Sequence, residues 1–317
     1  MRTLALGLAS LVLFLGLGEL VTRLLDRGGR IYDLETYRYS RLLTQPAGPD
    51  LHHLQVPGAS AELSGVEVRI NAHGLRDRDY PYDVPAGVKR LVLLGDSVSF
   101  GWGVPQDRVY AKVAEAELCR TGKYELINGA VVNYTTSRML AFYRDELSRY
   151  HARVVLLAFF LNNANDAAEP GIRSVLDTPL ELPVFVYSRL RRVLAHGPDF
   201  DAFHAALYAD DNPAFIAFRD RVTAFVHQLT AEGKTVVVVN VPDALHLDEP
   251  AYRYQPITDK VLGLARAAGA RTVDLLPAVK GVPAREIVNS AEDRHPNAEG
   301  HRRMGVYLAA ELRKLGI

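Results

Sequence analysis

The chain has 317 residues, of which 48% are hydrophobic, which is enough for one large α/β core with appendages. Lysine plus arginine and aspartate plus glutamate number 37 each, so there is no basic excess of the kind that a nucleic-acid-binding domain shows. The single cysteine, Cys119, excludes an intramolecular disulfide framework and a cysteine-based metal cluster.

The N-terminus is strongly apolar. Residues 4–18 contain no charged side chain, and after Glu19 the apolar trend continues to Leu25. A bilayer crossing needs about 20 mostly apolar residues, a length that this stretch reaches only if Glu19 lies near an interface. We therefore interpret residues 1–27 as a hydrophobic helix that anchors the chain in a membrane through residues 4–25.

Two alternatives to an anchor remain, a cleaved secretory signal and a buried or surface helix. Arg2 before a short apolar core suits a secretory signal, but a small-x-small cleavage site does not follow. Arg2 and the terminal amine favour an inside N-terminus, which would place the rest of the chain outside the cytoplasm. Arg23, Arg27 and Arg30 favour the opposite orientation.

The next segments are less regular. Residues 28–65 are polar, rich in tyrosine and contain proline, as in a linker or an irregular cap. In residues 66–80, three apolar side chains alternate with charged ones, which indicates a half-buried edge strand that ends in a turn at His73-Gly74.

From residue 90 onward, short apolar runs alternate with helical patterns. The runs are typical of strands covered on both faces, and they occupy residues 90–95, 124–128, 153–160, 234–241 and 271–276. The helical patterns occupy residues 106–120, 136–149, 213–233, 256–268 and 297–315. In the first helix we expect Val109, Val113, Ala114, Ala116 and Leu118 to point inward. Alternation of this kind predicts βαβ units and a parallel sheet of five strands.

Residues 167–212 interrupt this rhythm with scattered proline, tyrosine and arginine. We interpret them as an insertion near the carboxyl edge of the sheet, where ligands of parallel α/β sheets bind.

The first predicted strand runs directly into Gly95, Asp96 and Ser97, which places a serine at that edge. A serine hydroxyl is a poor nucleophile unless a base takes its proton and a third group orients that base. Without such partners, Ser97 would only cap the following helix.

The candidate base lies almost two hundred residues later. His295 stands just before the last predicted helix, with Asp293 two residues and Glu292 three residues before it. A carboxylate this close in sequence can reach the imidazole Nδ1 and fix the tautomer that leaves Nε2 facing the serine. The alternative is a surface loop in which His295 caps the helix.

Two further loops lie at the same edge. Asn165 and Asp166 follow the third strand, and a side-chain amide there can donate to a developing oxyanion, although an Asx turn is the simpler role. Residues 127–136 follow the second strand and offer backbone N–H groups. The order of these four signals along one sheet edge is more informative than any one of them.

These motifs resemble the SGNH hydrolase family, also called GDSL esterases and lipases, over residues 66–317. The GDS motif carries the nucleophile on Ser97, and the family's later asparagine and histidine fall on Asn165 and His295. The segment "NAHGLRD" resembles one found upstream of the serine in membrane-anchored bacterial members. The resemblance implies a three-layer α/β/α sandwich of the flavodoxin-like kind around the five-stranded parallel sheet.

Three positions depart from the family pattern. The glycine whose N–H donates to the oxyanion aligns with Asn133, a residue type that tolerates the left-handed conformation. The glycine of the family's G-x-N-D aligns with Asn163. The family usually places an aspartate three residues before the histidine, where this chain has Glu292, and we expect Asp293 to orient His295 instead.

We predict a serine esterase that forms an acyl-enzyme on Ser97, with His295 as the base and Asp293 as its orienting group. The Ser97 N–H, the Asn133 N–H and the Asn165 side chain would hold the oxyanion, and neither a cofactor nor a metal is required. An O-acyltransferase acting on a glycan or small-molecule hydroxyl is one alternative, and a catalytically silent glycan-binding domain is another.

The substrate would be an ester-bearing lipid, acylated glycan or small molecule, and nucleic acid is not an expected partner. We place the protein in a membrane through a single N-terminal helix, with the catalytic domain on the extracytoplasmic side. Phe100 and Trp102 would line an acyl pocket, stack on a sugar, or pack in the core.

Overall fold

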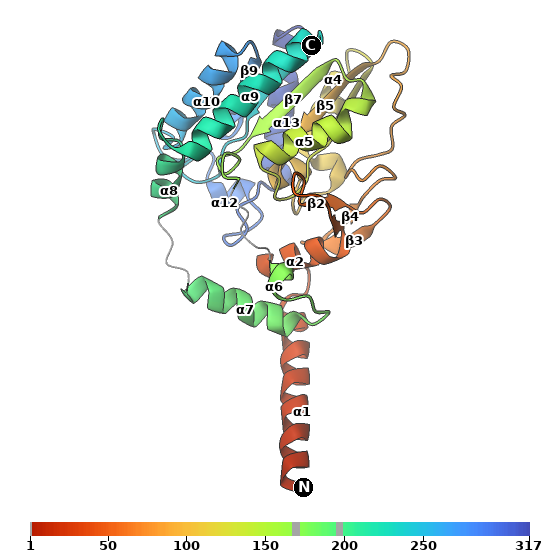
Figure 1. Ribbon diagram of the computed structural model, residues 1–317, viewed down its shortest axis with the longest axis vertical. Helices are drawn as coiled ribbons and strands as arrows, with labels where there is room; N and C mark the ends of the chain where they lie inside the picture. The colour runs from red at the N-terminus through yellow and green to blue at the C-terminus, as the bar shows by residue number, and fades with distance from the viewer. Residues whose placement is uncertain (1, 167–171, 195–198) are drawn as a thin grey trace.

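The structure is a computed structural model, and it describes residues 2–166, 172–194 and 199–317. Residues 167–171 and 195–198, which belong to the predicted insertion 167–212, lie outside the described residues. Helix α1 (Arg2–Leu25) projects from one end of the molecule, and the rest of the chain forms a layered α/β body (Figure 1).

The body is built on one parallel sheet of five strands in the order β6-β5-β7-β8-β9. The prediction of a five-stranded parallel sheet is confirmed. The strands are β5 (Lys89–Leu94), β6 (Tyr124–Asn128), β7 (Val154–Phe159), β8 (Thr235–Asn240) and β9 (Arg271–Asp274).

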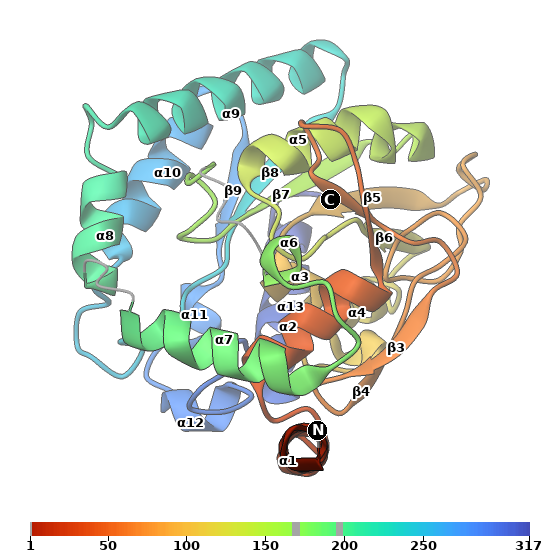
Figure 2. The same cartoon turned by 60° about the horizontal axis from the view of Figure 1, so that its bottom comes forward.

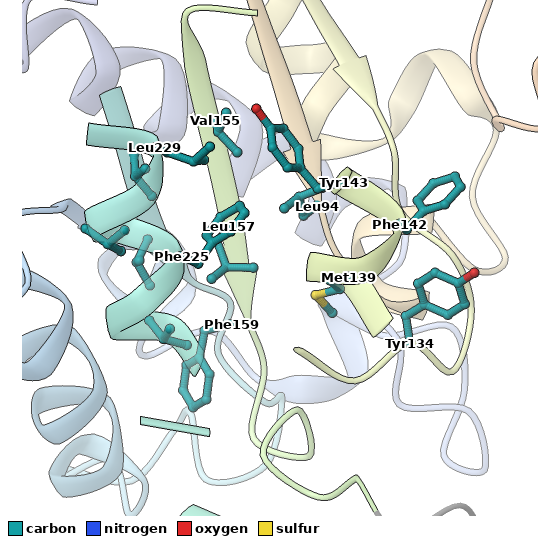
Figure 3. Close-up of a cluster of buried hydrophobic side chains, with 14 of the residues drawn as sticks. Leu94, Tyr134, Met139, Phe142, Tyr143, Val155, Leu157, Phe159, Phe225 and Leu229 are labelled. Atoms are coloured by element: carbon teal, nitrogen blue, oxygen red, sulfur yellow. The ribbon is translucent and has the colours of Figure 1, made fainter. Parts of the chain in front are cut away.

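Helices cover both faces of the sheet, so the predicted three-layer sandwich is also confirmed. On one face, Leu94, Val155 and Leu157 pack under α5 and α9 (Figure 3). The residues between them on the strands, such as Leu93 and Leu156, pack on the other face under α4 and α13. Successive strand residues point to opposite faces, so burial on both faces requires the continuous apolar runs seen in the sequence. The layer helices are α4 (Tyr110–Leu118), α5 (Thr136–Asp145), α9 (Pro213–Ala231), α10 (Gln255–Ala267) and α13 (Ala298–Lys314).

One predicted helix is shorter than its pattern indicated. Residues 106–120 divide into a 3-10 turn, Gln106–Arg108, and α4, because Val109 between them is extended. The expected inward position of Ala116 is wrong, since its side chain is exposed, and Tyr110 and Ala111 take the inner face instead. A second 3-10 turn, Leu147–Tyr150, likewise follows α5.

The segment before the sheet, predicted as a linker or cap, contains regular structure. Helix α2 (Tyr32–Leu42) is followed by two antiparallel pairs, β1 (Thr44–Pro46) with β2 (His53–Gln55) and β3 (Ser60–Leu63) with β4 (Val66–Arg69). Their apolar side chains form one buried cluster with Phe100 and Trp102, two residues that follow the nucleophile candidate. The segment therefore packs directly beside Ser97.

Six further helices complete the described part of the chain. They are α3 (Ser97–Phe100), α6 (Ile172–Val175), α7 (Glu181–Leu194), α8 (Phe200–Leu207), α11 (Leu276–Val279) and α12 (Ala284–Ile287). Helix α7 lies close to α1 and α2 at the end of the body from which α1 emerges (Figure 2).

His301 is a buried histidine between α13 and α4. Its Nδ1 accepts a hydrogen bond of 3.1 Å from the Tyr110 N–H, and its ring stacks on that tyrosine with the centroids 5.8 Å apart. Burial lowers the pKa of His301 to about 3 from its ordinary value of 6.5. The imidazole is therefore neutral in the folded protein at neutral pH.

This burial predicts acid sensitivity. Between about pH 6.5 and pH 3 the unfolded chain holds a proton on His301 that the folded chain does not, so the free energy of unfolding falls as the pH is lowered through that range. The contribution of one such group is about 1.4 kcal/mol per pH unit.

The variant His301→Gln keeps an acceptor for Tyr110 and should flatten this pH dependence of the free energy of unfolding. Denaturant unfolding, followed by the fluorescence of Trp102, the single tryptophan, measures it. His227→Gln, at an exposed position on α9, is the control. An unchanged slope in His301→Gln would contradict this account.

Candidate active site

Ser97 follows the carboxyl end of β5, an interior strand of the sheet between β6 and β7, and is the first residue of the short helix α3. The turn requires a glycine at position 95, because a Cβ there would lie 2.3 Å from the Ser99 Oγ. Asp96 caps the helix by accepting a 3.0 Å hydrogen bond from the Val98 N–H through its side chain. The turn leaves Ser97 partly accessible, whereas Ser99 is fully buried and hydrogen-bonds to Tyr110.

The structure brings Ser97, His295 and Asp293 into one hydrogen-bonded chain. The Ser97 Oγ lies 2.8 Å from the His295 Nε2, and the His295 Nδ1 lies 2.6 Å from the Asp293 Oδ1. When the neutral imidazole carries its proton on Nδ1, that N–H donates a hydrogen bond to the carboxylate. Nε2 is then the acceptor that faces the serine hydroxyl. This is the arrangement that activates a serine nucleophile.

The loop that carries His295 is held by its own hydrogen bonds. The Asn289 N–H donates to the His295 carbonyl at 2.9 Å, and the Asp293 Oδ1 also accepts from the His295 N–H at 3.1 Å. The Asn289 side-chain amide donates to the Asp293 Oδ2 at 3.1 Å and to the Trp102 carbonyl at 3.0 Å. Asn289 thus connects the orienting carboxylate to the segment that follows the serine. Its role could not be predicted from the sequence, because an asparagine six residues before the histidine belongs to no motif.

The two neighbouring carboxylates occupy different environments. Asp293 contacts His295 and its side chain is 12% exposed. The Glu292 side chain is 54% exposed, and its carboxylate lies 4.0 Å from Arg189 on α7. Asp293 therefore has the position from which a carboxylate can orient the imidazole.

The two predicted oxyanion residues lie in the loops that follow β6 and β7. Asn133 adopts a left-handed backbone conformation, with φ of 65°, which asparagine tolerates better than most residues. Asn165 is half-buried, and its backbone N–H donates to the Asn162 carbonyl at 3.1 Å. Asp166 accepts a 2.6 Å hydrogen bond from Ser137 and pairs with Arg221.

Asn163 stands where the family has a glycine, and its buried side chain has a specific contact. Its amide nitrogen donates to the Asp96 Oδ2 at 3.0 Å, while its side-chain oxygen accepts from the Phe160 N–H at 2.7 Å. Burial raises the pKa of Asp96, and the hydrogen bonds from Asn163 and Val98 act in the opposite direction. Asn163 thereby links the loop after β7 to the turn that holds Ser97.

The "NAHGLRD" segment, residues 71–77, contacts the backbone just after the Ser97 turn. The buried Arg76 guanidinium donates to the carbonyls of Phe100, Gly101 and Val104 at distances of 3.0, 2.6 and 2.7 Å. Burial lowers the pKa of Arg76 to about 10, so the guanidinium stays charged at neutral pH. The neighbouring Asp77 accepts from the Asn128 N–H at 2.8 Å and from Lys112 at 3.0 Å, which fixes the end of β6.

Aromatic rings surround the imidazole. Phe100 and Trp102 are buried in the cluster described above, so they pack in the core. The Trp102 ring centroid nevertheless lies 6.2 Å from that of His295, and the ring of Tyr32 lies 5.8 Å from it. Burial, and secondarily the Asp293 carboxylate, raises the pKa of Tyr32, so its phenol is neutral. Tyr32 was not predicted at the site, and the tyrosine-rich composition of residues 28–65 was the only hint.

No three histidine, cysteine, aspartate or glutamate side chains gather as a possible metal site within the part of the chain that the structure describes.

Residues 93–303 match the sequence profile of the GDSL-like lipase/acylhydrolase family, over a stretch that contains Ser97, Asn165 and His295. The chain belongs to this family. The resemblance seen in the sequence is thereby confirmed, and hydrolysis of ester bonds is the activity that membership supports. Among curated protein sequences, none matches the chain.

Three solved structures match the chain at low sequence identity. TesA is 17% identical, with 71% of this chain and 99% of TesA covered and a TM-score of 0.47. The lipase/acylhydrolase from Enterococcus faecalis is 16% identical, with 72% and 96% covered and a TM-score of 0.46. A variant of Axe2, an acetyl-xylooligosaccharide esterase from Geobacillus stearmophilus, is 14% identical, with 72% and 94% covered and a TM-score of 0.46.

The two adjacent carboxylates provide a matched test of the site. Asp293→Asn should lower kcat for ester hydrolysis by about 10²- to 10⁴-fold, because the amide no longer holds the imidazole in the required tautomer. Glu292→Gln should change kcat less than about threefold, since its carboxylate does not contact His295. Steady-state hydrolysis of a chromogenic ester measures both. Equal losses in the two variants, or a larger loss in Glu292→Gln, would show that the orienting carboxylate is misassigned.

Proposed function

We propose that this GDSL-family protein is a serine esterase that hydrolyses carboxylic esters through an acyl-enzyme on Ser97. The observation that carries the proposal is the continuous hydrogen-bonded chain from the Ser97 hydroxyl through His295 to Asp293. The position of Ser97 at the carboxyl end of β5 also supports it, because substrates of parallel α/β sheets approach from that side.

The first half of the reaction acylates the serine. The Ser97 Oγ attacks the ester carbonyl carbon while the His295 Nε2 takes the hydroxyl proton, which gives a tetrahedral intermediate and an imidazolium. Asp293, bonded to Nδ1, stabilises the positive charge on that ring. His295 then returns the proton to the leaving alcohol oxygen, the carbon–oxygen bond of the ester breaks, and the acyl group remains on Ser97.

The second half repeats these steps with water. His295 removes a proton from the attacking water, and the proton then passes to the Ser97 oxygen as the carboxylic acid leaves. Transfer to a sugar hydroxyl would differ only in this second nucleophile, which is why the acceptor must be tested separately.

The oxyanion of both intermediates is assigned to the Ser97 N–H, the Asn133 N–H and the Asn165 side chain. The loop position of Asn133 supports this, because the loop after β6 leaves the sheet at the same edge as Ser97, and Asn133 has the left-handed backbone that a glycine would otherwise supply there. The half-buried Asn165 lies in the loop after β7, the strand next to β5. One donor of this kind typically contributes about 3 kcal/mol of transition-state stabilisation.

We also propose the domain organisation and the location. Residues 66–317 form the hydrolase domain with its insertion at 167–212, and residues 28–65 cap the site, since α2 places Tyr32 beside His295. Helix α1 is long and apolar enough to cross a membrane, and its leucine, valine and phenylalanine side chains from Leu4 to Leu17 are exposed. At 1.5 Å per residue its 24 residues span about 36 Å, against about 30 Å of hydrocarbon. This supports a membrane anchor.

Two serines on the same turn test the nucleophile. The full chain in detergent should hydrolyse short p-nitrophenyl esters, and Ser97→Ala should lower kcat/KM by at least about 10³-fold. Ser99→Ala is the matched control, because Ser99 is buried against Tyr110 and does not face His295. It should lower the free energy of unfolding by about 1–3 kcal/mol and leave kcat within a few-fold. Hydrolysis that survives in Ser97→Ala would refute the proposed mechanism.

The same assay decides between water and another acceptor. With an esterase, the products are free acid and alcohol at a rate that added glucose or glycerol does not change. Faster release of p-nitrophenol together with an acylated sugar or glycerol would instead identify a transferase.

A further inference from the structure

Helix α7 (Glu181–Leu194) exposes apolar side chains on its outward face. Val186, Leu190 and Val193 are 45%, 55% and 77% exposed, and their spacing of four and three residues places them on one stripe. Val184 and Ser188, on the opposite face, are buried. A surface helix of a water-soluble protein has the reverse arrangement, with polar residues outside.

This stripe faces the end of the molecule from which α1 projects. The buried face of α7 packs on α2, where Val184 forms a cluster with Ile31, Leu34 and Tyr37. In Figure 1, α2 lies between α7 and the sheet, and α1 extends beyond α7 on the far side. Figure 2 shows α7 crossing the base of the body near the point where α1 leaves it. The outward stripe therefore lies on the side of the body from which α1 extends.

Specific contacts fix α7 against α1. The Glu19 carboxylate accepts hydrogen bonds from the first two N–H groups of α7, those of Glu181 at 3.0 Å and Leu182 at 2.8 Å. The Arg23 guanidinium pairs with Glu19 at 2.7 Å and donates to the Pro179 carbonyl at 3.3 Å. Gly18 lets the helices approach closely, since a Cβ there would lie 2.9 Å from the Leu182 side chain.

The half-buried Arg38 on α2 completes the junction. Its guanidinium lies 2.6 Å from the Asp26 carboxylate at the end of α1 and 2.7 Å from that of Glu181 on α7. Ion pairs thus link α2 to α7 and to the residue that follows α1 at one point. The angle between α1 and α7 is set by the protein and does not depend on a flexible linker.

The lengths of the apolar segments place α7 at the membrane surface. Residues 4–18 span about 22 Å and residues 4–25 about 33 Å, so a hydrocarbon layer of about 30 Å ends between Glu19 and Leu25. Glu19 is the residue that contacts the start of α7. A helix that begins at this level and runs across α1 lies in the plane of the interface.

We propose that α7 is an in-plane membrane helix whose outward stripe inserts into the boundary between headgroups and acyl chains of the bilayer that α1 spans. The proposal rests on the anchor proposed above. The exposed Leu194 extends the stripe, and α7 also carries Arg189, Arg191 and Arg192, basic side chains of the kind found on interfacial helices. Helices of this kind bury their apolar face about 5–10 Å below the surface.

The position of α7 brings the candidate active site close to the bilayer. Arg189 of α7 lies 4.0 Å from Glu292, the neighbour of Asp293, and Arg192 lies 2.6 Å from Asp33, the neighbour of Tyr32. Through these two ion pairs, α7 contacts both the loop that carries His295 and the start of α2, where Tyr32 lies beside the imidazole. Esters carried at the membrane surface, on lipids or on glycans attached to lipids, are therefore the substrates within shortest reach.

Spin-labelled lipids test this placement in the full chain. Single cysteines are introduced as Val193→Cys on α7 and Leu11→Cys on α1, each in a Cys119→Ser background, and are coupled to an environment-sensitive fluorophore. The native Cys119, exposed at the end of α4, serves as the control for a water-facing position. The proteins are reconstituted in phosphatidylcholine–phosphatidylglycerol vesicles with nitroxides placed either near the headgroup or at the end of the acyl chain.

At position 193 we expect blue-shifted emission, which shallow nitroxides quench more strongly than deep ones. At position 11 we expect quenching by nitroxides in the bilayer. At Cys119 we expect neither a blue shift nor quenching. Quenching at 11 with water-like emission at 193 would overturn the proposal for α7 and leave the anchor intact. Blue-shifted emission at 193 without quenching would mean that protein, and not lipid, covers the stripe. If neither position 193 nor position 11 is quenched, the membrane anchor is refuted together with the placement of α7.

Discussion

The hydrogen bond between the Ser97 Oγ and the His295 Nε2 joins two loops that are 198 residues apart in the chain. Its 2.8 Å length requires that the turn after β5 and the loop before α13 both be fixed to within a fraction of an ångström. Much of the surrounding structure meets that requirement. Arg76 and Asn163 hold the serine turn, and Asn289 holds the carboxylate that orients the imidazole.

The sheet and its covering layers were predictable because burial on both faces leaves little freedom in composition. Each apolar run of residues 90–276 became a strand to within two residues at either end, and the inward face of α9 follows its 3.6-residue period. The ends of helices were less predictable. The extended Val109 divides one helical pattern, and packing against α13 turns Tyr110 inward in place of Ala116. Tertiary contacts decided both.

The nucleophile, base and carboxylate were identifiable from residue types and their order along the chain, but the groups that position them were not. Asn289 and Arg76 act through contacts with backbone carbonyls, which any sequence offers and no motif records. Tyr32 comes from a segment with no strong periodicity. Glu19, which interrupts the apolar run, contacts the start of α7, a helix about 160 residues away, and only the folded chain shows that contact.

The proposed function depends on the nucleophilicity of Ser97, which His295 and Asp293 activate. The most direct measurement is intact mass and peptide mapping after reaction of the full chain with a fluorophosphonate, which labels activated serines and spares ordinary hydroxyls. The account predicts a single adduct on the peptide that contains Ser97, formed much more slowly in His295→Asn because the base is lost. Labelling at another serine, or no adduct in a folded protein, would contradict it.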